Sequence, residues 1–327
     1  LHASGADTRI ELEHVTMRAP AGVPGLAIAA GDGAHAELRH VEVSGWAGFA
    51  VYVADGSALL EDIVLRDVTS GGPGALAIGA VRTGTLEVRR ARLENIDGIG
   101  VLAQGAGRVI TLEDVTLRAV RGGLERSGYG IAISAGAEAD LARIAITESA
   151  EGIGVFEASA RLSDVRVVDA VALGPIWSGT GLTVLTGDVE AERLLVERAQ
   201  AMGVHAGEGA TVRLTDLTVR ATRARPCEDD CELGTFGAGV VAQGSGRVAI
   251  ERFFVGDNEL CGVRVVEGGF LELHQGEVSG NPIGASVEVP EFDVAQLYDR
   301  VVFDNVRNLD RSGLPVARPD LISPDLP

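Results

Sequence analysis

A short motif recurs along the whole chain and restricts the folds that the chain can form. It reads Leu-x-x-Val-x-Leu with conservative apolar replacements, and successive copies lie 21 to 36 residues apart. A unit of this length is too short to bury a core of its own, so neighbouring units must stack on one another. The twelve copies begin at Leu12, Leu38, Leu60, Val88, Leu112, Leu141, Leu162, Ala191, Leu214, Ile250, Leu273 and Tyr298.

A second motif, Gly-hydrophobic-x-hydrophobic, precedes most of these copies, as in GIAI from Gly130 and GVRV from Gly262. Apolar and polar residues alternate in runs of three to five, which is typical of strands. We therefore predict an all-β solenoid of about twelve coils, with three short strands per coil and parallel pairing between coils. A leucine-rich repeat is disfavoured because its helical half and its Asn signature are missing.

Composition agrees with many short strands and excludes several functions. The chain has 44 Gly, few aromatic residues and a formal net charge of −19, and all of its 28 basic residues are Arg. A chain without Lys has no Schiff-base lysine chemistry, and an acidic chain is a poor partner for nucleic acid. No apolar stretch is long enough to predict a membrane-spanning segment.

The stacked pattern resembles the right-handed parallel β-helix family, the pectate-lyase-like superfamily, and within it the β-helix-repeat proteins of bacterial exteriors. The resemblance covers about residues 8 to 306 and implies a single-stranded right-handed parallel β-helix over 1–306, followed by a Pro-rich C-terminal tail over 307–327. It also implies an extracellular, cell-surface or periplasmic location. Because the chain begins at Leu1 without an initiator Met or a signal peptide, we expect neighbouring domains of a longer product.

The corner inside each Leu-x-x-Val motif carries alternating charges. The second intervening residue alternates in sign from Asp62 to Arg252, so we predict a ladder in which each carboxylate has a guanidinium above and below it. This structural interpretation is favoured over a row of catalytic Asp. His14 and His40 continue the column and could share a metal, but with no third ligand we favour no metal role.

Three long insertions precede the Gly strands of alternate coils, and each carries one aromatic residue near its end: Tyr129, Trp177 and Phe236. Alternate coils are about 9.5 Å apart, close to one disaccharide repeat. We therefore predict these three residues as ligand-binding positions for a polysaccharide. The alternative is that each ring packs against its own loop.

Beside those insertions we expect a flat, outward-facing column of mostly small residues. In the enzymes of the superfamily the polysaccharide lies on the corresponding face. No position here is Asp or Glu, so a glycosidase pair of carboxylates is missing. The weak catalytic candidates are His205, Arg264, Asp229 and Asp230. The expected column is Ala27, Ala50, Ala77, Gly100, Ala132, Gly154, Thr183, His205, Val241, Arg264 and Ser286.

Three cysteines bear on redox state and metal binding. Cys227 and Cys231 bracket an acidic loop and are predicted to form a small disulfide, whereas Cys261 is either a buried free thiol or the partner of one loop cysteine. The pair lacks a second pair at a zinc-like spacing, so zinc is disfavoured. We expect no cofactor; the loop acids could bind Ca²⁺, although a solvated loop is favoured.

These observations favour a non-catalytic extracellular or surface module that binds carbohydrate or another surface protein along the flat face and its loops. Two alternatives stay open: a polysaccharide lyase or glycoside hydrolase that uses loop residues, and a purely structural spacer.

Overall fold

The computed structural model describes residues 1–19, 24–70, 74–106, 109–122, 128–171, 179–224 and 237–311. It divides into two compact units, which among the described residues comprise residues 1–161 and 162–311. Each unit consists of stacked coils of a parallel β-solenoid, with about twelve turns in the whole chain. No described helix is long and apolar enough to cross a membrane.

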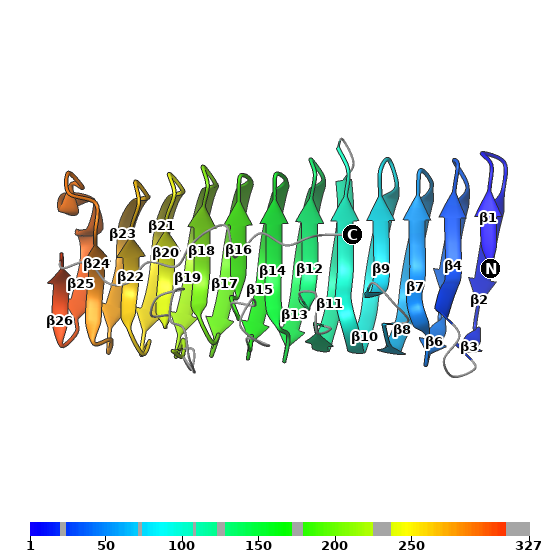
Figure 1. Ribbon diagram of the computed structural model, residues 1–327, viewed down its shortest axis with the longest axis horizontal. Coiled ribbons are helices and arrows are strands. Elements are labelled where there is room, and N and C mark those ends of the chain that lie inside the picture. Colours follow the sequence, from blue (N-terminus) through cyan, green and yellow to red (C-terminus); the bar gives the residue numbers. More distant parts are fainter. Residues whose placement is uncertain are drawn as a thin grey trace. The chain divides into compact units, whose positions relative to one another are not determined.

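The first unit contains the coils of the N-terminal half (Figure 1). Its strands are β1 (His2–Ser4), β2 (Arg9–Glu13), β3 (Thr16–Arg18), β4 (Pro24–Gly31), β5 (His35–Arg39), β6 (Glu42–Ser44), β7 (Ala47–Ala54), β8 (Ser57–Val68), β9 (Ala75–Val81), β10 (Thr85–Gln104), β11 (Val109–Arg121), β12 (Tyr129–Ser134), β13 (Glu138–Thr147) and β14 (Glu151–Phe156).

The second unit has the same architecture, and most of β15 (Ser159–Val168) lies within it. One short 3-10 helix, η2 (Val294–Leu297), interrupts its last coils. Its other strands are β16 (Leu182–Leu185), β17 (Asp188–Glu197), β18 (Met202–Gly207), β19 (Thr211–Arg220), β20 (Ala238–Ala242), β21 (Arg247–Gly256), β22 (Cys261–Val265), β23 (Phe270–Ser279), β24 (Ile283–Val287), β25 (Asp299–Asp304) and β26 (Arg307–Asp310).

Within each unit, the strands of one coil pair in parallel with those of the next. Short strands such as β12 and β14 form one sheet, which we call sheet A, and longer strands such as β11 and β13 form sheet B. The predicted parallel β-solenoid is therefore confirmed. In sheet A, β26 pairs with β24, and this pairing runs from Arg307 to Asp310.

The three predicted segments per coil are separate strands in early coils, as in β4, β5 and β6, but two of them merge into one bent strand in later coils. The bend falls at the second residue between Leu and Val in all twelve motifs. These bend residues have φ between 52° and 58°, a left-handed conformation that is uncommon for residues other than Gly. They are His14, His40, Asp62, Arg90, Asp114, Arg143, Asp164, Arg193, Asp216, Arg252, Gln275 and Arg300.

The motif's apolar residues form the interior. In the coil of β11, Leu112 and Val115 are fully buried and Leu117 is nearly so. Their partners in the next coil, Leu141 and Ile144, are buried as well, so one continuous apolar column runs through the first unit.

The charged bend residues form bidentate pairs rather than a continuous ladder. Arg90 donates to both carboxylate oxygens of Asp62, at 2.7 and 2.9 Å, and Arg143 pairs in the same way with Asp114 at 2.6 and 3.1 Å. No ion pair joins Arg90 to Asp114 among the described residues, although Arg90 adds a weak long-range attraction that lowers the pKa of Asp114. Among the described residues, each of these Asp side chains therefore pairs with the guanidinium that the following coil supplies.

A second polar ladder, which the sequence motif does not indicate, lies inside the second unit. The side-chain oxygen of Asn281 accepts from the backbone and side-chain nitrogens of Asn258, both at 2.9 Å, and Asn281 donates in turn to Asn305 at 3.0 and 2.8 Å. Asn258 and Asn281 are buried. Each Asn thus satisfies backbone donors at a corner that is closed to water.

Candidate functional site

The strands of sheet A place two consecutive residues toward the interior, and this changes the predicted outward column. In β7, Ala50 and Val51 are both buried, whereas the rings of Phe49 and Tyr52 stack on the outer face at 5.5 Å and are only half-buried. The two inward residues between them shift the alternation by one position.

The same arrangement occurs in the second unit. A Cβ added to Gly203 would meet the side chain of the core residue Val219, and the next residue, Val204, is fully buried. A Cβ added to Gly207 would instead meet the ring of His205. His205 therefore lies on the outer face of sheet A.

The register also differs from the expected one. Gly98 pairs with Ala75, but Val101 pairs with Ile131, so Gly130 is level with Gly100 rather than with Gly98. Ala27, Ala50, Ala77 and Gly100 consequently belong to an inward column. The true outer positions, which we call the outer row, are Ala29, Tyr52, Gly79, Leu102, Ala132 and Gly154 in the first unit and Thr183, His205, Val241, Arg264, Ser286 and Asp310 in the second.

The outer row of the second unit is polar at five of its six positions, and all five are buried. Thr183, His205 and Ser286 are 1%, 0% and 2% exposed, and the charged Arg264 and Asp310 are only 5% and 8% exposed. The expectation of a flat, open face is therefore not met. Polar side chains are rarely kept in such an environment without a partner or a function.

His205 is the most unusual residue of this row. Among the described residues, neither of its ring nitrogens has a hydrogen-bond partner, and neither does the hydroxyl of its register neighbour Thr183. Burial lowers the pKa of His205 to about 4, and the nearby Gln243 side chain acts in the opposite direction as the smaller of the two influences. The imidazole is therefore neutral at neutral pH, with a donor and an acceptor both unused.

Charged groups lie on the same face as His205. Arg264 donates to Glu288 at 3.1 and 2.9 Å, and both side chains are almost fully buried. Gln243 donates to Glu267 at 3.0 Å. Because His205 and Arg264 are two rungs apart in register, their backbones are about 10 Å apart.

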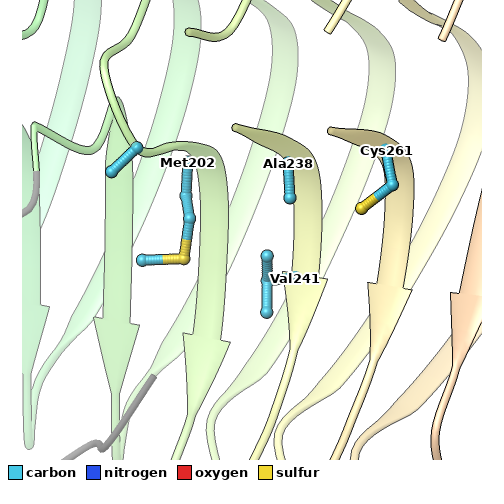
Figure 2. Packing of buried hydrophobic residues seen from close by; sticks show 5 residues of the cluster. Met202, Ala238, Val241 and Cys261 are labelled. Atoms are coloured by element: carbon cyan, nitrogen blue, oxygen red, sulfur yellow. The ribbon is translucent and has the colours of Figure 1, made fainter. Parts of the chain in front are cut away.

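An apolar cluster lies beside the polar row. Met202, Ala238 and Cys261 occupy one column of sheet A, and Val241 lies farther along the strand of Ala238 (Figure 2). Cys261 is a free thiol, and burial raises its pKa to about 12. It is therefore protonated and unreactive in this environment.

On the first unit, Tyr129 lies on the outer face but is only 2% exposed, with its ring edge against Phe156 at 5.6 Å. Its register partner Glu151 is a carboxylate that is 3% exposed. The expected column did not include Glu151, because Glu151 lies in the column of Tyr129 and not in the row of Gly154; the polar residue directly before Gly152 was the available signal.

The structure thus places two predicted candidates, His205 and Arg264, on one row and brings Tyr129 to the same type of face in the other unit. The other predicted residues lie outside the described residues: Trp177, Phe236, Asp229, Asp230, Cys227 and Cys231. Within the described ranges, no three His, Cys, Asp or Glu residues are grouped closely enough to hold a metal ion. His14 and His40 stack with ring centroids 4.6 Å apart, exposed at the bends.

Comparison with known proteins identifies the fold. No protein-family model matches the chain, and no curated protein matches it in sequence. The solved structures similar to it include the periplasmic alginate epimerase AlgG, at 11% identity and a TM-score of 0.54 over 93% of this chain and 76% of the epimerase. A double mutant of that epimerase matches at 10% identity and a TM-score of 0.59, over 94% of this chain and 73% of the other. A PL6 alginate lyase matches at 10% identity and a TM-score of 0.44, over 92% of this chain and 83% of the lyase. The chain is a parallel β-helix protein, and it shares this fold with the alginate epimerase.

Proposed function

We propose that this protein is an extracellular or periplasmic polysaccharide-binding β-helix, and that the outer row of its second unit forms the binding surface. The observation that carries the proposal is the pair of buried, unused hydrogen-bonding groups on Thr183 and His205. Sugar hydroxyls both donate and accept hydrogen bonds, so they complement a neutral imidazole and a threonine hydroxyl. The periplasmic alginate epimerase on the same fold supports the location and the class of ligand.

The burial of the row requires that a ligand replace whatever packs against it. Leaving buried polar groups unpaired costs about 1 to 3 kcal/mol each. A ligand that satisfies them recovers this free energy, so specificity should depend more on Thr183 and His205 than on the exposed charges at the bends.

A second candidate is a polysaccharide-active enzyme. The neutral imidazole of His205 favours it, because a base must be unprotonated to accept a proton. Carboxylates for glycoside hydrolysis are not paired across the outer row, where Asp310 is the acidic position. Proton abstraction from a sugar ring is therefore better supported than hydrolysis.

A glycan array tests the binding proposal. The wild-type chain should retain polysaccharide fragments, and the double variant Thr183→Val with His205→Phe should lose them, because it removes both hydrogen-bonding groups while keeping apolar volume. Arg143→Gln, at an exposed bend, is the matched control and should bind like wild type. Equal retention by the double variant would exclude the outer row as the binding surface.

The catalytic candidate is tested on the polymers that the array retains. New unsaturated ends or a changed sugar configuration by NMR, lost in His205→Phe, would establish catalysis. Unchanged polymer after prolonged incubation would leave binding as the function.

A further inference from the structure

The apolar cluster beside the outer row is covered although it lies on the outside of the solenoid. Met202 is 3% exposed, Val241 is 4% exposed and Cys261 is fully buried, and Leu260 and Ile283 pack against them. The outer face of a sheet is ordinarily in water, and a continuous apolar patch there indicates a surface that another segment contacts.

The path of the chain suggests which segment this is. Asp310 pairs with Ser286 and is itself a member of the outer row, so the chain leaves sheet A on the face that carries the cluster. The guanidinium of the next residue, Arg311, donates to the carbonyl of Pro290 at 3.0 Å. The described chain therefore ends, at Arg311, beside the row.

The length and composition of residues 312–323 fit this surface. The segment contains Leu314, Val316, Leu321, Ile322 and two prolines. Proline removes backbone donors and favours an extended polyproline conformation, which cannot continue a strand ladder but can lie along an apolar groove. At about 3.1 Å per residue, twelve residues span about 37 Å. The five coil steps from Asp310 back to Thr183 need only about 24 Å.

We propose that residues 312–323 dock along the outer face of sheet A in the second unit, covering the apolar cluster of Met202, Ala238, Val241 and Cys261 and the adjacent outer row. The segment is then an internal occupant of the surface that the polysaccharide would use. Competition between the segment and the polysaccharide rests on the proposed function, whereas the docking itself does not.

Reactivity of Cys261 reports the docking without any carbohydrate. In the full chain with Cys227→Ser and Cys231→Ser, Cys261 is the single remaining thiol. Replacing Leu321 and Ile322 with Asp should weaken apolar docking and accelerate thiol labelling by Ellman's reagent about ten-fold, because labelling requires the covered state to open. The control, Ser312→Asp with Ser323→Asp, adds the same charge to the same segment and should label at the parent rate.

Two rival coverings give different results. If the loop over residues 225–236 covers the cluster, Phe236→Asp will accelerate labelling while the Leu321/Ile322 variant will not. If a second copy covers it, labelling will slow as protein concentration rises. Either result, or equal rates in all variants, overturns the proposal. An unchanged unfolding midpoint across the variants shows that labelling reports local opening.

The glycan array separates the two proposals. If both are right, the Leu321/Ile322 variant will bind the retained glycan more tightly than wild type does. Faster labelling without any glycan binding would uphold the docking and reject the polysaccharide function.

Discussion

Two rows of polar side chains repeat with the coils of this protein, and they differ in their exposure to water. The bend residues lie in solvent, and their Asp–Arg pairs satisfy one another, as in Asp114 with Arg143. The outer row of the second unit is buried, and there Thr183 and His205 have no hydrogen-bond partner among the described residues. Paired, exposed charges specify how coils stack, whereas unpaired, buried polar groups point to a ligand.

Removing one member of the buried ion pair should have the largest effect. Arg264→Met leaves the Glu288 carboxylate buried without its guanidinium, and we expect a loss of about 3 to 5 kcal/mol in the free energy of unfolding. Urea denaturation measures it. The double change Arg264→Met with Glu288→Leu should lose less than the single change, because it leaves no buried carboxylate without a guanidinium; an equal or larger loss would contradict this role of the pair.

Next in size is a pH effect that belongs to His205. Its pKa is about 4 when folded and about 6.5 when unfolded, so the unfolded state binds more protons between these values. The contribution of the neutral His205 to the free energy of unfolding is therefore complete above pH 6.5. It falls by up to about 3 kcal/mol as the pH approaches 4.

His205→Gln should remove the fall in stability between pH 6.5 and pH 4, which we call the pH slope, while keeping a polar side chain of similar volume. Thermal unfolding at a series of pH values measures it. His40→Gln at an exposed bend serves as the control and should retain the slope. A slope that persists in His205→Gln would show that other groups cause it.

The buried Asn ladder should give a smaller loss. Asn281→Ala removes the acceptor for the Asn258 backbone, and an unsatisfied buried donor costs about 1 to 3 kcal/mol. Asn95 makes a similar side-chain bond to Asp67 in an exposed corner, at 2.9 Å. Asn95→Ala should therefore cost much less, and equal losses in urea denaturation would contradict the role of burial.

The smallest effect is expected at the bends. The exposed pairing with Arg143 lowers the pKa of Asp114, so its contribution is present at neutral pH and disappears as the pH falls below the carboxylate range. Asp114→Asn preserves a residue type that tolerates the left-handed bend, and the unfolding midpoint at pH 7 should fall by less than about 2 °C. A much larger fall would mean that these pairs hold the coils together.

The sequence predicted the coils, the bends and the inward Leu and Val positions, because each repeats with the period of the coil. It placed the outer row from Ala132 onward but not in the earlier coils, since the segment from Gly98 to Gly100 offers two glycines that align equally well with the neighbouring coils. The Asn ladder had an available signal, the coil spacing of 23 and 24 residues between Asn258, Asn281 and Asn305. No signal in the sequence indicated the burial of His205, because this burial depends on what packs against the outer face rather than on alternation along the strand.

The most direct test of the central claim compares histidines from the two rows in one NMR titration. With ring-labelled histidine, the oligosaccharide retained on the array is added to the wild-type chain at neutral pH. We predict that the His205 ring resonances shift in a saturable way while those of His14 and His40, exposed at the bends, do not. Binding that leaves His205 unshifted would contradict the assignment of the outer row as the polysaccharide surface.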